Sequence, residues 1–362
     1  MAAVPALDLT VDVVELTRAL CDAQSVSDEE GPLADAIEAA VRRVPHLVVR
    51  RYGDTVVART ELGRAARVVI AGHIDTVPLN GNLPSRLEVV AGEEVLVGRG
   101  TVDMKGGVAV QLRLAAELAE PAVDVTWIWY DHEEVGEALN GLNRLAQQHP
   151  EELAGDFAIL GEPTAAGIEG GCNGNLRAEI RTYGRRAHSA RGWVGVNAIH
   201  LAAPILDRLA AYEPRSVEVD GLVYREGLNA VGVTGGVAGN VIPDECMVHV
   251  NYRFAPSRSP EEAEAHVRAV FAGYDVRIVD LAGGARPGLD VPVARDFVAA
   301  VGATPRPKYG WTDVARFSRL GVPAVNYGPG DPLLAHADYE RVPTEQIRSC
   351  EAGLRAWLLH RP

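Results

Sequence analysis

The sequence predicts an α/β protein in which a doubly wound, mixed-sheet catalytic domain is interrupted by an inserted α+β domain of the split βαβ, ferredoxin-like kind. Two observations support this prediction. Short uninterrupted apolar runs alternate with helical periodicity in the first part of the chain, and the apolar pattern returns near its end. Between these parts the order of predicted strands and helices changes. We therefore expect a discontinuous domain of residues 1–172 and 282–362, with residues 173–281 inserted into it.

The first domain begins with two predicted helices, at residues 10–22 and 28–44, where apolar side chains recur at helical spacing. A hairpin follows, in which residues 46–51 pair with residues 55–60 across a short turn. Continuous apolar runs then have the composition of buried, mostly parallel strands, at residues 67–71, 123–130, 157–160 and 324–327. Residues 105–118, opened by two glycines, predict the crossover helix between the first two of these strands.

The inserted domain has the pattern of an independent α+β unit. Its predicted elements follow the order βαββαβ, at residues 176–183, 195–211, 230–237, 245–254, 260–271 and 275–279. The sheet pattern of the first domain resumes only after this unit. A candidate ligand of the first domain, His336, also lies beyond it, so the unit is expected to be an insertion.

Composition excludes several classes of partner. At 362 residues the chain is long enough for two domains, each with its own core. Its formal net charge of −14 disfavours nucleic acid and anionic lipid, since both require a cationic surface. Its four cysteines are scattered, so neither a disulfide framework nor a thiolate zinc site is indicated. With no signal-peptide pattern and no membrane-spanning apolar stretch, we expect a cytoplasmic protein that acts on a small molecule.

Candidate metal ligands follow the ends of short apolar runs. They are His73, Asp103, Glu134, Glu162 and His336. Taken singly each is weak evidence, because a lone histidine near a strand end is usually structural and a Glu-Glu pair usually begins a solvated helix. Together they lie where ligands collect in open α/β sheets, at the carboxyl ends of strands. Two imidazoles and three carboxylates suit two zinc ions bridged by one carboxylate and one water, which predicts a dinuclear metallohydrolase.

Residues beside these ligands are expected to complete the chemistry. Of the adjacent glutamates, we assign Glu134 to the metal and Glu133 to the bridging water, as the general base. Asp75 lies two residues after His73, on the same side of an extended segment. It is therefore expected to hold the imidazole of His73 by its other N–H.

The combined motifs resemble a known family, the co-catalytic zinc exopeptidases and N-deacylases, which include aminoacylases, carboxypeptidases and acetylornithine deacetylases. The likeness is carried by His73-x-Asp75, Gly100-x-x-Asp103-x-Lys105-Gly-Gly, Glu133-Glu134, Gly161-Glu162-Pro163 and the late His336. It implies two Zn²⁺ per chain, with Co²⁺ or Mn²⁺ as substitutes. One zinc would be held by the residues at positions 73 and 162, the other by those at 134 and 336, and both by Asp103. It also implies that the inserted domain is a lid through which the protein forms a homodimer.

Within this family, three segments resemble the actinobacterial succinyl-diaminopimelate desuccinylases, at residues 100–107, 307–317 and 326–336. The implied reaction removes succinate from N-succinyl-LL-2,6-diaminopimelate, a step toward lysine and the cell wall. Acetylornithine deacetylases, aminoacylases and dipeptidases of the family share the metal ligands and remain alternatives. A non-catalytic metal-containing binding protein is the alternative of another class. Retention of Glu133 argues against it, since a structural zinc has no use for an uncoordinated base.

The resemblance also assigns residues beyond the metal ligands. It implies that His188 of the lid helps form the oxyanion hole across the dimer interface, although an isolated loop histidine is usually just exposed. It implies a set of substrate-binding residues, Arg253, Asn240, Arg191, Gly310 and Thr312. Arginine binds carboxylates bidentately, which suits an anionic substrate, although Arg253 could instead pair with acidic lid residues. Arg99 and Lys105 flank Asp103 and are either supports of that residue or substrate ligands.

Overall fold

The computed structural model describes residues 4–360, and the chain divides into two compact units. The first comprises Met1–Gly170, Pro287–Arg306 and Arg316–Pro362, and the second comprises Gly171–Arg286 and Pro307–Ala315. This division places residues 307–315 with the second unit, whereas the sequence pattern predicts them in the first. Among the described residues, no helix is long and apolar enough to cross a membrane.

The first unit is built on a mixed sheet, which in residues 4–360 has eight strands. Their spatial order is β1 (Val48–Tyr52), β2 (Thr55–Arg59), β6 (Asp124–Tyr130), β3 (Arg67–His73), β7 (Phe157–Leu160), β18 (Ala324–Asn326), β8 (Glu169–Gly170) and β17 (Arg306–Pro307). The central strands β6, β3, β7 and β18 pair in parallel, and the β1, β2 and β8 pairings are antiparallel. The predicted fold class and buried runs are therefore confirmed.

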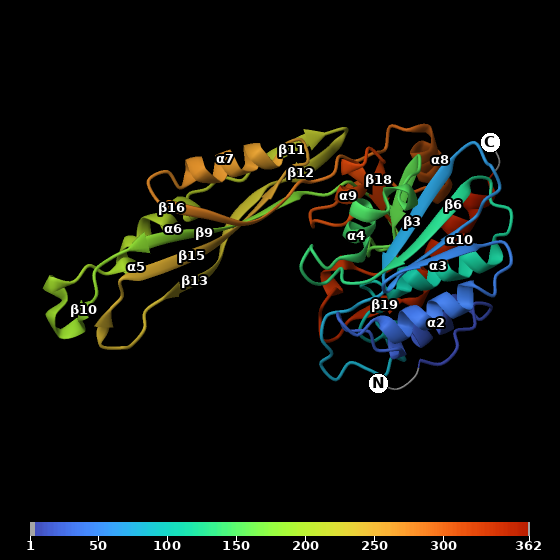
Figure 1. The fold of residues 1–362 in the computed structure, drawn as a ribbon, viewed down its shortest axis with the longest axis horizontal. Helices are drawn as coiled ribbons and strands as arrows, with labels where there is room; N and C mark the ends of the chain where they lie inside the picture. Colours follow the sequence, from blue (N-terminus) through green and yellow to red (C-terminus); the bar gives the residue numbers. More distant parts are fainter. Residues whose placement is uncertain (1–3, 361–362) are drawn as a thin grey trace. The chain divides into compact units, whose positions relative to one another are not determined.

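Helices cover this sheet and close its core. They are α1 (Val13–Asp22), α2 (Gly31–Val41), α3 (Lys105–Glu117), α4 (Gly141–Gln148), α8 (Pro292–Val301) and α10 (Thr344–Leu359). Helix α9 (Val314–Arg319) begins in residues of the second unit and continues in the first. Helices α1, α3 and α10 pack on one another. Helix α3 also contacts β3, and Figure 1 labels both elements. The β6 strand is buried along its whole length, since helices and neighbouring strands leave no face exposed. Helix α1 begins at Asp12, whose side chain accepts a hydrogen bond from the Val14 amide.

A small sheet that the sequence pattern does not predict lies in the same unit. Its strands are β4 (Arg86–Val90), β5 (Glu93–Val97) and β19 (Arg341–Pro343), in the order β19-β5-β4. Strand β19 pairs antiparallel with β5, with Arg341 opposite Val97. This pairing brings the segment before α3 next to the segment that follows His336.

The second unit contains the predicted βαββαβ pattern as an antiparallel sheet in the order β13-β15-β9-β16. Its strands are β9 (Gly174–Tyr183), β13 (Gly227–Gly235), β15 (Glu245–Phe254) and β16 (Asp275–Ala282). Alternate side chains of β15 are buried, and those of Val248, Val250 and Tyr252 pack in one core with residues of the unit's helices. The period of two in the burial pattern indicates that helices cover one face of this sheet.

The second unit differs from the prediction in two places. The helix expected over residues 195–211 is two short helices, α5 (Ala198–Leu201) and α6 (Ala203–Ala210), and Pro204 lies in the first turn of α6. Proline has no amide hydrogen to donate inside a helix, so a new helix begins there.

An unpredicted hairpin, β11 (Ser216–Val219) with β12 (Leu222–Arg225), turns at Asp220 and Gly221, which both have positive φ. The helix α7 (Pro260–Val270) begins at a capping box formed by Ser259 and Glu262.

Candidate metal centre

The predicted ligands of the first unit come from adjacent elements. His73 is the last residue of β3, Glu134 lies just beyond β6, and Glu162 follows β7. These three strands are parallel neighbours, so their carboxyl ends meet at one edge of the sheet. Asp103 lies in the loop before α3, and His336 lies between the short 3₁₀ helix η3 (Pro332–Leu334) and β19. The fold thus brings together five side chains that are widely separated in the sequence.

Asp103 lies between the two histidines. Its Oδ1 is 3.0 Å from Nε2 of His73, and its Oδ2 is 3.3 Å from Nε2 of His336. On its other side, the same nitrogen of His336 is 3.0 Å from Oε2 of Glu134. The two oxygens of one carboxylate therefore face two different imidazoles, so this carboxylate could contact two cations at once.

The donor atoms form overlapping groups that fit divalent cations. One group comprises His73, Asp103 and Glu162, and another comprises Asp103, Glu134 and His336; within each, the ligand atoms lie within 4.8 Å of one another. The groups share Asp103 and contain only imidazole nitrogen and carboxylate oxygen. Such ligands suit zinc. A third group comprises His73, Glu133 and Glu134, so Glu133 also lies beside this centre.

The charges around the two histidines also fit cations. Hydrogen bonds that the His336 imidazole donates to the Asp103 and Glu134 carboxylates raise its pKa to about 10. Burial alone would lower the pKa of His73, but its contacts with Asp103 and Asp75 raise it well above the usual value. The imidazoles thus lie among carboxylates that favour a positive charge, and bound cations would supply that charge in place of protons.

Asp75 connects two parts of the centre. Its carboxylate accepts hydrogen bonds from the backbone amides of Glu133, at 3.0 Å, and Glu134, at 3.1 Å, and from the Ser27 hydroxyl at 2.8 Å. Burial would raise the pKa of Asp75, but His73 and these amides hold it at about 2. The Nδ1 atom of His73 is 3.0 Å from the Asp75 carbonyl oxygen and 3.4 Å from its carboxylate. The nearer partner of the imidazole is therefore the backbone carbonyl, not the predicted side chain.

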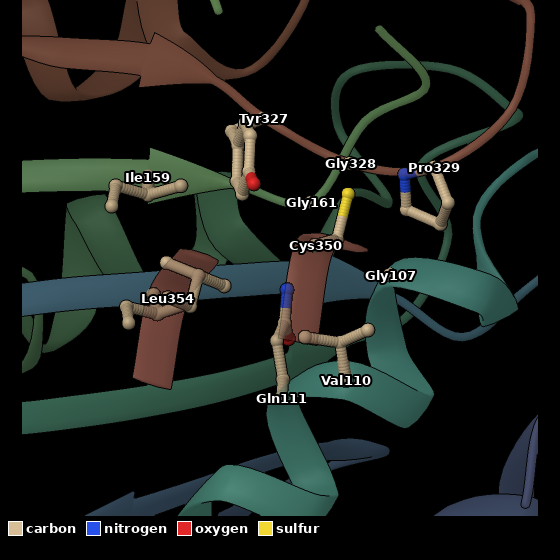
Figure 2. Close-up of a pocket in the computed structure, with 11 residues that line it drawn as sticks. Gly107, Val110, Gln111, Ile159, Gly161, Tyr327, Gly328, Pro329, Cys350 and Leu354 are labelled. Carbon is tan, nitrogen blue, oxygen red and sulfur yellow. The ribbon is translucent and has the colours of Figure 1, made fainter. Parts of the chain in front are cut away.

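Glycines let α3 approach the strand ends behind the ligands. A Cβ atom on Gly161, the residue before Glu162, would lie 2.6 Å from Nε2 of Gln111, which itself donates to the Ala71 carbonyl at 2.9 Å. Figure 2 shows the small cavity beside Gln111, lined by residues of α3, α10 and the strand ends. Its volume of about 10 Å³ admits roughly one water molecule. A substrate does not fit there.

Lys105 and Arg99, for which the sequence left two roles open, are buried and hydrogen-bond to other parts of the first unit. Lys105 is 1% exposed and donates from Nζ to the Ala23 carbonyl at 2.8 Å. Arg99 is 4% exposed and pairs with Glu340 at 2.8 Å. Glu340 was not predicted from the sequence, because a single carboxylate four residues after His336 has no signal that separates it from solvated ones.

The predicted residues of the second unit form two separate groups. His188 is exposed, and its Nδ1 accepts a hydrogen bond from the Ala190 amide at 3.0 Å. It lies in β10 (Ala187–His188), which pairs with β14 (Val241–Ile242). Asn240 precedes β14, and its carbonyl accepts from the Ser189 amide at 2.9 Å. Arg191 follows in the 3₁₀ segment Ser189–Val194.

The other group includes Arg253, near the Phe254 end of the four-stranded sheet, whereas β10 and β14 form a separate two-stranded sheet whose strands adjoin the Tyr183 and Glu245 end in sequence. Arg253 is the next-to-last residue of β15 and pairs with Asn175, near the start of β9. It is half-buried, and burial lowers its pKa. Thr312 is 5% exposed, and its carbonyl is 3.7 Å from Sγ of Cys172; Gly310 is exposed. The structure therefore does not bring all predicted substrate residues of one chain together.

Comparisons with known proteins agree with this fold. A model of peptidase family M20/M25/M40 matches residues 69–360. A Corynebacterium glutamicum succinyl-diaminopimelate desuccinylase is 48% identical over 365 residues, covering 98% of both chains. A Mycobacterium tuberculosis protein provisionally named as the same enzyme, DapE, is 55% identical and covers 97% of this chain and 99% of its own.

Solved structures share the fold at low identity. A tripeptidase from Staphylococcus aureus has a TM-score of 0.79 at 17% identity and covers 98% of both chains. The YXEP protein of Bacillus subtilis, described as a dinuclear metal-binding peptidase, has a TM-score of 0.68 at 17% identity over 96% of both chains.

Proposed function

The chain belongs to peptidase family M20/M25/M40, and we propose that it hydrolyses N-succinyl-LL-2,6-diaminopimelate to succinate and LL-diaminopimelate. The substrate is supported by the full-length likeness to desuccinylases at 48% and 55% identity. The single observation that carries the chemistry is Asp103, whose two carboxylate oxygens face the imidazoles of His73 and His336. That arrangement suits amide hydrolysis at a dinuclear centre.

His73 and Glu162 would hold one Zn²⁺, Glu134 and His336 the other, and Asp103 both, with Co²⁺ or Mn²⁺ as substitutes. When bound, the ions supply Lewis acidity, which polarises the amide carbonyl and acidifies water. The support for this assignment is the pair of ligand groups that share Asp103.

Glu133 would act as the proton carrier. It takes a proton from water as the water oxygen attacks the succinyl carbonyl carbon, and it returns that proton to nitrogen as the C–N bond breaks. The Glu133 amide donates to Asp75 at 3.0 Å, so the loop that carries the base is held by the same residue whose carbonyl lies beside His73. This contact fixes the position of the Glu133 loop relative to the His73 imidazole.

Homodimerisation through the second unit is supported by geometry within that unit. Arg253 lies eight residues along β15 from Glu245, which is roughly 27 Å of strand, and His188 lies beyond the Glu245 end. A small substrate cannot span that distance. If both residues contact one substrate, they come from different chains. The edge strand β13 also exposes Val231 (64%) and Val233 (53%), as a surface that a second copy would cover.

A comparison of substrates tests the proposed function. We expect zinc-loaded protein to hydrolyse N-succinyl-LL-diaminopimelate with a kcat/KM roughly a hundredfold or more above that for N-acetylornithine or an unmodified dipeptide, because charged substrate groups discriminate strongly. Release of succinate and of a free amine would be measured in parallel. A higher kcat/KM for acetylornithine or for the dipeptide would reassign the substrate within the family, and no turnover of any amide would overturn the proposal.

A further inference from the structure

A fully buried carboxylate joins the two loops that carry Asp103 and His336. The side chain of Glu340 is 0% exposed, and its Oε1 accepts hydrogen bonds from the backbone amides of Val102, at 2.9 Å, and Asp103, at 3.1 Å. Its Oε2 is 2.8 Å from Nη1 of Arg99. Glu340 therefore accepts hydrogen bonds from the backbone amides that lead into Asp103, and it also pairs with the buried guanidinium of Arg99.

The local fold explains why Glu340 reaches this loop. Arg341 lies opposite Val97 in the pairing of β19 with β5, and the Gly98 amide donates to the Glu340 carbonyl at 3.0 Å. The chain from Gly98 to Asp103 then curves back over the Glu340 side chain. Arg99 also donates from Nη2 to the carbonyl of His336, at 3.5 Å. Glu340 and Arg99 thus connect the segment that leads to Asp103 with the segment that follows His336, and both of these residues are proposed metal ligands.

We infer that Glu340 is a positioning residue for the metal centre, which sets the orientation of Asp103 and the position of the His336 loop without touching substrate. The physical reason is that Asp103 must present each oxygen to a different histidine, at 3.0 and 3.3 Å, and small rotations of its backbone would break one contact. Charge-assisted hydrogen bonds to two successive amides restrain that rotation. The inference rests on the proposed metal centre.

The test compares Glu340 with Glu152, another buried glutamate that pairs with arginine but contacts residues outside the ligand loops. The side chain of Glu152 is also 0% exposed, and it contacts Arg50 at 2.6 Å, Arg59 at 3.1 Å and the Tyr52 hydroxyl at 2.8 Å. The variants are E340Q and E152Q in the full-length chain. The E340Q substitution would keep the shape of the side chain but place an amide N–H donor where acceptors are needed. E340D provides a second variant, which keeps the charge but shortens the reach.

Zinc release from the intact holoprotein to a chromogenic chelator is the main measurement, at a temperature where circular dichroism shows each variant folded. We expect E340Q and E340D to hold zinc roughly ten- to a hundredfold more weakly than the wild type, and E152Q to hold it as tightly as the wild type while melting at a lower temperature. The visible spectrum of the cobalt-loaded protein should change in E340Q and not in E152Q.

The outcomes separate this inference from the proposed function. If the wild type itself retains no zinc, the proposed metal centre fails. If the wild type retains zinc and both Glu340 variants retain it equally well with an unchanged cobalt spectrum, Glu340 is only a stabilising residue and the inference is overturned. Equal loss of zinc from the Glu340 variants and from E152Q would overturn it as well, since the effect would then be a general one of stability.

Discussion

Gly107 lies in the first turn of α3. For its replacement by alanine, helix propensity predicts a gain in stability and packing predicts a loss. Replacing glycine by alanine inside a helix normally stabilises by about 1 kcal/mol. Here a Cβ atom would lie 2.3 Å from the carbonyl oxygen of Gly161 and 3.0 Å from its carbonyl carbon, whereas ordinary contact begins at 3.4 Å. Helix and strand end would have to separate by about 1 Å. Overpacking of this kind costs about 1–3 kcal/mol, occasionally more.

We therefore expect Gly107→Ala to be destabilised by up to about 2 kcal/mol net, which lowers the Tm by up to about 8 °C for a unit of this size. The displaced residue precedes Glu162, so zinc should also be released more readily to a chelator. Differential scanning calorimetry and chelator competition measure the two effects.

Gly136→Ala is the matched control. No heavy atom lies within 4 Å of the position that its added methyl group would take, and its φ is not in the left-handed region, so the change should be neutral or stabilise by about 0.4–1 kcal/mol. A Gly107→Ala protein with a raised Tm and unchanged zinc retention would refute the packing argument.

Three further outcomes are expected. Glu133→Gln should lower kcat by roughly 10²–10⁴-fold with zinc content preserved, whereas Glu134→Ala should lose zinc; an empty metal site in the first variant would reverse these roles. Burial would raise the pKa of Glu152, but Arg50 and Tyr52 hold it below its usual value, so this carboxylate stabilises the fold above pH 4.5 and loses that effect as the pH falls through its lowered pKa. The difference in urea stability between the wild type and Glu152→Gln should accordingly shrink from about pH 7 to about pH 3, and a constant difference would contradict the assignment. Finally, mixing Glu133→Gln and His188→Ala chains should restore about a quarter of wild-type activity if His188 acts across the dimer interface. Half of the dimers are then mixed, and each mixed dimer has one intact site of two. Verified mixed dimers without activity would show that His188 does not act in the partner's site.

Elements that bury a continuous or periodic apolar pattern were predictable from the sequence. The strand Phe157–Leu160 and the strand Glu245–Phe254 have the predicted bounds, because their burial follows directly from local composition and alternation. The family and the fold class are likewise confirmed. The roles of the individual site residues stay predictions, although the structure brings the five candidate ligands together.

Features that depend on long-range pairing were not predictable. The strand Arg341–Pro343 has only three residues, and its partner β5 begins with two exposed glutamates, so neither has a clear apolar pattern. Glu340 gains its role only through that pairing. In the same way, residues 307–315 group with the second unit through tertiary contacts that composition does not encode. His336 was predicted as a ligand from its place after an apolar run, but it lies in a loop well beyond β18 and not at the end of that strand.

Zinc titration of the metal-depleted, full-length protein tests the dinuclear centre most directly. Aliquots of zinc would be added while desuccinylase activity is followed, and the zinc content of the most active sample would be determined by elemental analysis. Because Asp103 faces one histidine with each oxygen, we expect activity to rise until two zinc ions are bound per chain. A plateau at one zinc per chain, with no gain from further metal, would contradict the co-catalytic centre.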